Sequence, residues 1–243
     1  MTDDPLFRAL GHAFPEGGRA IVIGASGGIG SAAHALLTES GAFVEVLSAS
    51  RSMNSALDIT VERSIVTLAA ALADGPPLRL VFTASGLLHD GALQPEKALR
   101  QIDPAGMARL FAVNSIGPAL LLKHLSPLLP RKGRSVFAAL SAKVGSIGDN
   151  SLGGWIGYRA SKAALNQILR TAAVELARTR PEAVVAALHP GTVATSLSKP
   201  FSAAGLDVRQ PDTAARDLLT VVAGLTPVES GGFFDYRGAA LPW

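Results

Sequence analysis

The sequence predicts an α/β fold in which one parallel sheet of about seven strands is covered by helices on both faces. Short apolar runs alternate with longer helical stretches along all 243 residues, which is the pattern of a doubly wound sheet. No linker, internal repeat or low-complexity segment divides the chain. Residues 1–243 are therefore expected to form a single domain.

The predicted strands are short apolar runs bounded by glycine, proline or polar loops, and the predicted helices are longer periodic stretches. The strands are expected at residues 19–23, 43–48, 56–60, 78–82, 134–140, 183–188 and 232–235. The helices are expected at residues 31–40, 61–73, 104–125 and 211–225, with a long one that ends near residue 178. Residues 1–18 are expected to be an irregular lead-in, residues 87–103 a loop, and residues 193–210 a mobile lid over a substrate.

The composition is that of a globular protein with a large core, because 48% of the residues are hydrophobic and 17% are charged. Cysteine is absent, which excludes disulfides, thiolate metal sites and cysteine nucleophiles, and no metal centre is expected. The formal charge is +3, but the Lys and Arg residues are scattered, so no nucleic-acid partner is expected. No export signal and no uninterrupted apolar segment of about 18 residues is present. We therefore expect a soluble, cytoplasmic protein without a membrane span.

A glycine-rich loop joins the first predicted strand to the first predicted helix. Glycines let the backbone approach a pyrophosphate, and the helix N-terminus offers N–H donors and the positive end of the helix dipole. The spacing Gly-x-x-x-Gly-x-Gly differs from the commonest dinucleotide fingerprint, so a merely tight turn is the alternative. The residues expected to hold phosphate are Gly24, Ser26, Gly27, Gly28, Ile29 and Gly30.

The end of the second predicted strand indicates which dinucleotide would bind. An acidic residue there holds the ribose 2′-hydroxyl of NAD, whereas a basic residue accommodates the 2′-phosphate of NADP. The segment 48–51 offers Ser50 and Arg51 and no acid, which favours NADP(H), with NAD(H) as the alternative. Further along, Asp58 is expected either to face an adenine or to cap the following helix.

Tyr158 and Lys162 are four residues apart in a predicted helix and therefore lie on one face. A cation beside a phenol favours the phenolate, so we expect Lys162 to lower the pKa of Tyr158 from its usual value of about 10. Such a tyrosine can exchange a proton with an alcohol or a carbonyl. In the helix before it, Pro118 offers no N–H to the Asn114 carbonyl, which is then free to hold a water. His189 precedes a proline and is expected to be structural.

Together these motifs resemble the short-chain dehydrogenase/reductase family, in its compact single-domain branch with a Rossmann-type fold. Residues 23–30 are similar to its motif Thr-Gly-x-x-x-Gly-Ile-Gly, with Ile23 in place of Thr. The resemblance implies four active-site residues, Asn114, Ser141, Tyr158 and Lys162. It also implies that the cofactor contacts Asp58, Ile59, Ala84, Ser85, Gly86, Tyr158, Lys162, Pro190, Gly191, Thr192, Val193 and Thr195.

The chain departs from the family pattern in two places. The family's Asn-Asn-Ala-Gly is Thr83-Ala84-Ser85-Gly86 here, so two side-chain amides near the adenine are missing, which affects cofactor affinity. The interval from Ser141 to Tyr158 is longer than usual, which reshapes the substrate pocket. Residues 149–155, 87–91 and 241–243 are similar to the C-factor-like group.

The resemblance implies hydride transfer between NADP(H) and a small-molecule carbonyl or secondary alcohol. Ser141 would hydrogen-bond the carbonyl oxygen, Tyr158 would protonate the alkoxide, and Lys162 would bind the nicotinamide ribose. An NAD-preferring alcohol dehydrogenase and a cofactor-binding signalling or regulatory protein with little turnover are the alternatives. Family members usually pair through the helices after the fourth and fifth strands, so a homodimer or homotetramer is expected, with residues 120–122 and 163–165 as apolar candidates for the contact.

Overall fold

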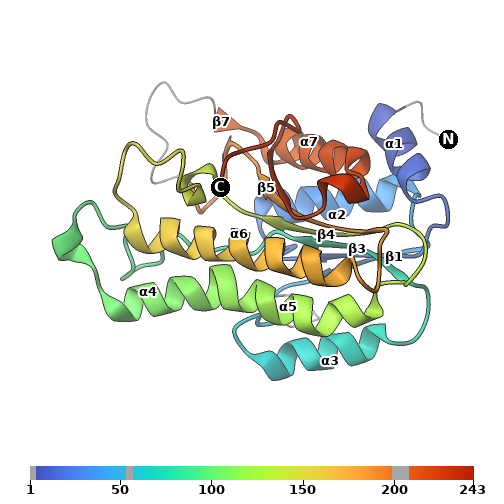
Figure 1. Cartoon of the computed structure of the whole chain (residues 1–243), viewed down its shortest axis with the longest axis horizontal. Coiled ribbons are helices and arrows are strands. Elements are labelled where there is room, and N and C mark those ends of the chain that lie inside the picture. The colour runs from blue at the N-terminus through green and yellow to red at the C-terminus, as the bar shows by residue number, and fades with distance from the viewer. Residues whose placement is uncertain (1–3, 53–56, 199–207) are drawn as a thin grey trace.

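The computed structural model describes residues 4–52, 57–198 and 208–243. Its main sheet has the order β2-β1-β3-β4-β5-β8, and every neighbouring pair is parallel (Figure 1). The strands are β1 (Arg19–Ile23), β2 (Glu45–Ala49), β3 (Leu78–Thr83), β4 (Ser135–Leu140), β5 (Ala183–His189) and β8 (Gly232–Asp235). The doubly wound parallel fold predicted from the sequence is confirmed, with six strands in this sheet.

The predicted strand at residues 56–60 is wrong for the part that the structure describes. Leu57 and Asp58 have no regular structure, and the next two residues form a turn, while residue 56 lies outside the described residues. The cause is local. The Asp58 carboxylate accepts hydrogen bonds from the backbone N–H and the hydroxyl of Thr60 at 2.9 and 2.6 Å, and this turn competes with a sheet ladder.

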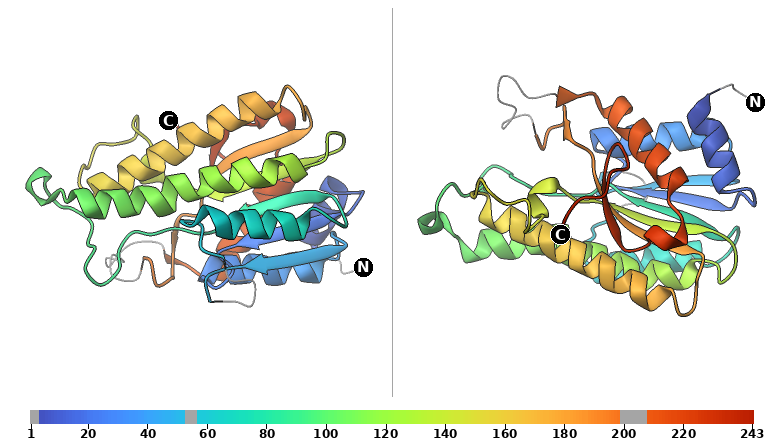
Figure 2. Two further views of the ribbon diagram at one scale, coloured as in Figure 1. Left: turned by 90° about the horizontal axis from the view of Figure 1, so that it is seen from below. Right: turned by 45° about the horizontal axis from the view of Figure 1, so that its top comes forward.

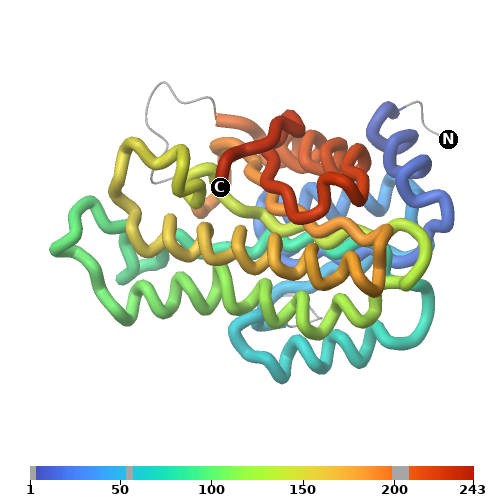
Figure 3. Tube along the Cα trace, viewed as in Figure 1, coloured from blue at the N-terminus to red at the C-terminus, as the bar shows by residue number. Residues whose placement is uncertain are grey.

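Two helical layers cover the sheet. On one face lie α1 (Pro5–Ala13), α2 (Gly28–Ser40) and α7 (Pro211–Gly224), which contact one another (Figures 1 and 2). The opposite face carries α3 (Glu62–Leu72), α4 (Pro104–Phe111), α5 (Gly117–Leu125) and α6 (Ile156–Leu176). In the trace of Figure 3, α6 runs beside the continuous helical run from α4 to α5.

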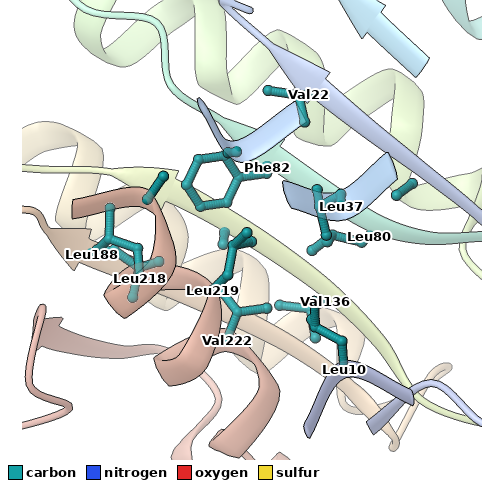
Figure 4. Close-up of a cluster of buried hydrophobic side chains, with 14 of the residues drawn as sticks. Leu10, Val22, Leu37, Leu80, Phe82, Val136, Leu188, Leu218, Leu219 and Val222 are labelled. Atoms are coloured by element: carbon teal, nitrogen blue, oxygen red, sulfur yellow. The ribbon is translucent and has the colours of Figure 1, made fainter. Parts of the chain in front are cut away.

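Each face of the sheet has its own apolar core, because successive strand residues point to opposite faces. Val22 and Phe82 pack with side chains of α1, α2 and α7, as Figure 4 shows. Their strand neighbours Ile21 and Val81 pack with the layer of α3, α5 and α6. All four are at most 1% exposed, so the central strands are anchored from both sides.

Helix α1 lies where an irregular lead-in was expected, so that expectation was wrong. The Asp4 carboxylate accepts a hydrogen bond from the Leu6 N–H at 2.8 Å, and Pro5 occupies the first helical position, a favourable helix start. Leu6, Phe7 and Leu10 are buried against the core. The proline that suggested irregular structure is in fact a helix-start signal.

The helical run Pro104–Leu128 is long and apolar enough by composition to cross a membrane, although polar and charged residues such as Arg109, Asn114 and Lys123 interrupt its apolar sequence. In the fold, 44% of its most apolar window is buried, and the run packs against α3 and α6. We therefore interpret it as a core helix, since a core helix of an α/β protein meets the same criteria.

Candidate active site

The predicted site residues follow the carboxyl ends of adjacent parallel strands, where open α/β sheets bind ligands. The glycine loop follows β1, Ser50 follows β2, Ala84 follows β3, Ser141 follows β4 and Pro190 follows β5. Backbone bonds join these ends, such as that from the Ser141 N–H to the Leu188 carbonyl at 2.7 Å.

The loops that follow these strands lie close to one another. A Cβ at Gly86 would lie 3.7 Å from both Asn114 Oδ1 and Lys162 Nζ. A Cβ at Gly28 would lie 3.3 Å from the Thr195 methyl group. The predicted cofactor and active-site residues therefore surround one region along this edge of the sheet.

The glycine loop has the shape that a dinucleotide phosphate requires. Gly24 has φ +84°, and a Cβ there would lie 2.8 Å from the backbone nitrogen of Ser85, so only glycine fits this turn. A Cβ at Gly30 would collide with the Gly24 carbonyl oxygen. Ser26, Gly27 and Gly28 are exposed at the start of α2, whose N-cap has no side-chain hydrogen bond from the described residues. Both the open loop and the uncapped helix start fit a bound phosphate.

The adenosine end combines an orphan hydroxyl with an exposed cation. Ser50 is 5% exposed, and its Oγ has no hydrogen-bond partner within the described part of the chain. Arg51 beside it is exposed. Hydrogen bonds from Thr60, with a smaller contribution from the charge of Arg51, hold the pKa of Asp58 below its usual value. An arginine and an unsatisfied hydroxyl suit a phosphate ester, so these residues fit NADP.

Asp58 and Ile59 have local structural partners. The carboxylate of Asp58 is engaged by the turn that leads into α3, and its carbonyl accepts from the Val61 N–H at 3.1 Å. Asp58 does not cap α3, because the N-cap residue is Val61, so the capping alternative was wrong. Ile59 is 7% exposed, and a Cβ at Gly117 would lie 2.9 Å from its side chain. The buried side chain of Ile59 thus packs on the start of α5.

Asn114 joins three segments through its side chain. Its Oδ1 accepts from the Leu87 N–H at 2.8 Å, and its Nδ2 donates to the Leu87 carbonyl at 2.8 Å and to Ser161 Oγ at 3.0 Å. Around it, residues Ala112–Ile116 form a π-helical turn in which Gly117 N–H bonds to the Ala112 carbonyl. A wider turn is expected where Pro118 offers no donor to the Asn114 carbonyl. The amide clamp was not predicted from the sequence.

Tyr158 and Lys162 lie on the buried side of α6, 7% and 3% exposed. Lys162 Nζ is 5.9 Å from the centre of the Tyr158 ring and donates to the Leu140 carbonyl at the end of β4, at 2.8 Å. Trp155 packs edge-on against the Tyr158 ring at 6.2 Å between centroids. The spacing in the sequence thus places phenol and ammonium side by side.

The expected lowering of the Tyr158 pKa is wrong for this structure. Burial raises the pKa of Tyr158 above its usual value, and burial lowers the pKa of Lys162 to about 8. The expectation considered only the attraction between the Lys162 ammonium and the Tyr158 phenolate. Burial also removes water from both groups, which disfavours the phenolate and the ammonium alike. Tyr158 is therefore a neutral phenol near pH 7, the state that donates a proton.

Ser141 is buried, and its hydroxyl lies 2.6 Å from Oδ1 of Asn166. Asn166 follows Lys162 by four residues on α6 and is also buried. It was not predicted as a site residue, although the spacing Tyr158, Lys162, Asn166 repeats every four positions along the helix.

Two further unpredicted residues fix the long loop before Tyr158. The Arg159 guanidinium donates to the carbonyls of Gly154 and Val144 at 2.9 and 3.2 Å. Glu96, 7% exposed, accepts from the Gly157 N–H at 3.2 Å with both carboxylate oxygens. A carboxylate is favourable at the first turn of α6 because of the helix dipole. Arg159 thus holds the loop, and Glu96 holds the start of α6.

The segment after β5 contains the remaining predicted cofactor residues. Thr192 and Val193 form β6 (Thr192–Val193), which pairs in parallel with β7 (Val208–Arg209). The predicted lid, residues 193–210, includes Val193 and the whole of β7, and its residues 199–207 fall outside the described residues. Arg209 stacks on the ring of Tyr236, 3.8 Å from its centre, and its guanidinium donates to the Pro190 carbonyl at 3.3 Å. These contacts fix the chain at Pro190 and Gly191.

Two histidines border the site. His189 Nδ1 accepts from the Lys143 N–H at 3.2 Å, and burial lowers its pKa to about 4, in agreement with a structural role. His89 lies within 3.2 Å of the Ser196 and Leu197 carbonyls through Nε2. It therefore links the 87–103 loop to the segment after β6. That loop also contains one 3-10 turn, Leu99–Gln101.

Comparison with known proteins identifies the family. The family model described as short chain dehydrogenase matches residues 19–205, more than half of the chain. This chain is a short-chain dehydrogenase. It is accordingly an NAD(P)-dependent oxidoreductase, as the resemblance implied.

Three relatives illustrate the similarity of this short-chain dehydrogenase. C-signal of Myxococcus xanthus is 39% identical over 147 residues, 60% of this chain and 84% of that protein, which agrees with the predicted C-factor-like resemblance. The 1-hydroxy-2-glutathionyl-2-methyl-3-butene dehydrogenase of Rhodococcus sp. strain AD45 is 34% identical over 191 residues, 77% of this chain and 78% of that protein. A Burkholderia multivorans structure described as a short-chain dehydrogenase/reductase with bound NADP is 26% identical, with TM-score 0.77, and the match covers 93% of this chain and 99% of that one.

Proposed function

We propose that this short-chain dehydrogenase uses NADP(H) to interconvert a carbonyl compound and a secondary alcohol, with Tyr158 as general acid and base. The observation that carries the proposal is the buried, neutral Tyr158 phenol beside Lys162, at the sheet edge where the glycine loop also lies. NADP(H), when bound, supplies or accepts the hydride. Residues 1–243 would act as one catalytic domain.

The residues of the chain then have separate roles. Tyr158 would donate its proton to the oxygen as negative charge develops there, and Ser141 would hydrogen-bond the same oxygen. Lys162 would stabilise the phenolate that Tyr158 leaves behind and hold the cofactor ribose. Donors fixed in place before the reaction stabilise a developing charge more than they stabilise the neutral substrate, which is how they increase the rate. The Asn114 carbonyl, freed by Pro118, would hold a water next to Lys162.

The proposal is tested by NADPH oxidation with a panel of aldehydes, ketones and quinones. We expect at least one compound to be reduced with one NADPH consumed per alcohol formed. If no compound in the panel supports turnover while NADPH raises the melting temperature, the second candidate function below is favoured instead.

NADP(H) rather than NAD(H) is proposed as the cofactor because Arg51 and the orphan hydroxyl of Ser50 stand at the adenosine end. The relative with bound NADP supports this choice. We expect Arg51→Ala to weaken NADPH binding by about tenfold and to leave NADH binding nearly unchanged, since a charge-assisted hydrogen bond to phosphate is lost. Thermal shifts at equal cofactor concentrations measure this. A larger shift of the wild type with NADH than with NADPH would contradict the assignment.

The pH dependence of reduction should follow Lys162. Its pKa is lowered to about 8 by burial, so the ammonium is present below that pH and lost above it, whereas Tyr158 keeps its proton because its pKa is raised. We expect kcat/KM for carbonyl reduction to be level below about pH 8 and to fall as the pH rises through it. Lys162→Arg, which stays protonated, should lack this fall in whatever activity it keeps. A wild-type profile that rises through this range would contradict the prediction.

A cofactor-binding signalling protein with little turnover is the second candidate function. The name of the relative C-signal is the observation that favours it. Binding of NADPH without turnover, together with unchanged behaviour of Tyr158→Phe in a signalling assay, would support it.

A homodimer or homotetramer of a cytoplasmic protein is also proposed from the family resemblance. Leu121 and Leu165, which were among the expected contact residues, belong to the chain's own core, so that part of the expectation was wrong. The outer surface of α5 and α6 instead carries a groove of about 740 Å³ that includes Gln167 and Ile168. Light scattering should give a mass of two or four chains, and a single-chain mass at all concentrations would contradict this.

A further inference from the structure

The amide of Asn166 holds the hydroxyl that is proposed to bind the substrate oxygen. Ser141 Oγ and Asn166 Oδ1 are 2.6 Å apart, and the two side chains are 4% and 3% exposed. In this arrangement the Ser141 hydroxyl donates its single proton to Oδ1 of Asn166. Ser141 can then only accept a hydrogen bond from a substrate.

The other end of the amide is unsatisfied. Nδ2 of Asn166 is buried and has no hydrogen-bond partner among the residues that the structure describes. A buried donor without a partner is unfavourable, because it has lost its hydrogen bonds to water and gained none in return. Turning the amide by half a turn exchanges its oxygen and nitrogen in nearly the same space. Nδ2 then donates to Ser141 Oγ, and the serine proton becomes free.

These two amide orientations match the two substrates of the proposed reaction. The oxygen of a carbonyl compound can only accept hydrogen bonds, so Ser141 must donate to it. An alcohol can donate its own proton, so Ser141 can accept from it while donating to Asn166. A side chain that can offer either a donor or an acceptor therefore allows Ser141 to bind both.

We propose that Asn166 is a positioning residue that sets the direction of the Ser141 hydroxyl proton, donating to Ser141 when a carbonyl is bound and accepting from it when an alcohol is bound. This inference rests on the proposed function. Asn166 acts only through Ser141, so its effect disappears when the hydroxyl is absent.

Asn166→Asp tests the proposal because an ionised carboxylate can only accept. In this variant the carboxylate should keep the Ser141 hydroxyl proton directed at itself and away from the substrate oxygen. We therefore expect kcat/KM to fall by about 100-fold, the loss typical of one missing donor to a developing oxyanion. Since the equilibrium constant of the reaction is unchanged, kcat/KM falls equally in both directions when cofactor binding is unaltered. The loss should appear mainly as a lower kcat in both directions, because the donated hydrogen bond stabilises the developing charge more than the bound carbonyl, with a modest rise in the KM of the carbonyl and an unchanged KM of the alcohol.

The pH profile gives a second readout. The carboxyl of Asn166→Asp gains a proton as the pH falls, at a pKa raised by burial, and can then donate to Ser141. Reduction by this variant should therefore recover towards the wild-type rate at low pH. Asn166→Leu, of similar size but without hydrogen bonds, should show no recovery. Gln101→Glu makes the same amide-to-carboxylate change at an exposed residue, where Oε1 accepts from the Lys97 and Ala98 N–H groups at 2.7 and 3.1 Å. A carboxylate keeps both contacts, so this variant should behave as wild type.

Equal losses in Asn166→Asp and Asn166→Leu without recovery at low pH, or wild-type kinetics in Asn166→Asp, would overturn the inference. If Asn166→Asp does not fold, judged by its NADPH thermal shift, Asn166→Leu combined with Ser141→Ala decides. The double variant should be no slower than Ser141→Ala alone, and additive losses would overturn the inference. A wild-type protein that reduces no carbonyl would instead remove the proposed function, and the inference with it.

Discussion

Tyr158→Phe is expected to lower the turnover of carbonyl reduction by about 10³-fold, because it removes the proton donor and keeps the ring. The aromatic contact with Trp155 at 6.2 Å is made by the ring and should persist. Affinity for NADPH should therefore change little. Steady-state turnover and the NADPH thermal shift, measured on the same preparation, separate loss of chemistry from loss of binding.

Tyr236→Phe is the matched control. Its ring stacks on Arg209 and Arg237, and those contacts do not need the hydroxyl. We expect turnover within about twofold of wild type, as for a surface change that removes no specific interaction. Wild-type turnover in Tyr158→Phe would show that another group supplies the proton.

Lys162→Met is expected to abolish most of the activity and at the same time to stabilise the cofactor-free protein. The burial that lowers the Lys162 pKa to about 8 from 10.5 corresponds to about 3 kcal/mol of unfavourable free energy when the amine is charged. Methionine removes that cost and loses the hydrogen bond to the Leu140 carbonyl, worth about 1 kcal/mol. Chemical denaturation near pH 7 should give a gain of about 1–2 kcal/mol in the free energy of unfolding.

The stability difference between wild type and Lys162→Met should depend on pH with a definite sign. Between about pH 8 and 10.5 the folded wild type has released the Lys162 proton and the unfolded chain has not. The unfolded state then binds more protons, so the free energy of unfolding of the wild type rises with pH and approaches that of the variant. A gap that widens over this range, or a variant less stable than wild type at pH 7, would contradict the account.

Most of the fold could be predicted from the sequence, because hydrophobic periodicity and loop composition are set by residues that are neighbours in the chain. The first β-α unit was predicted from the apolar run 19–23, the glycines after it and the helical stretch that follows them. The strand expected at 56–60 failed because Asp58 and Thr60 form a turn, which competes with strand pairing in a way that an apolar pattern does not reveal. Helix α1 was missed although Asp4 and Pro5 carry a helix-start signal.

The site was only partly predictable, because its chemistry depends on distant contacts. The spacing of Tyr158 and Lys162 gave their proximity, but the direction of the Tyr158 pKa depends on burial, which sequence spacing does not contain. Glu96 meets Gly157 from 61 positions away, and Asn166 meets Ser141 from 25. A single Glu or Asn has no local pattern that would indicate such partners, so both required the folded chain.

Transfer of deuterium from NADPH labelled at its transferring position tests the central proposal most directly. We expect the wild type to place the label on the alcohol carbon of a product from the carbonyl panel, and Tyr158→Phe to do so about 10³-fold more slowly. Wild-type protein that binds NADPH but labels no product, or Tyr158→Phe that labels product at the wild-type rate, would contradict the proposal that Tyr158 protonates the substrate oxygen as hydride arrives.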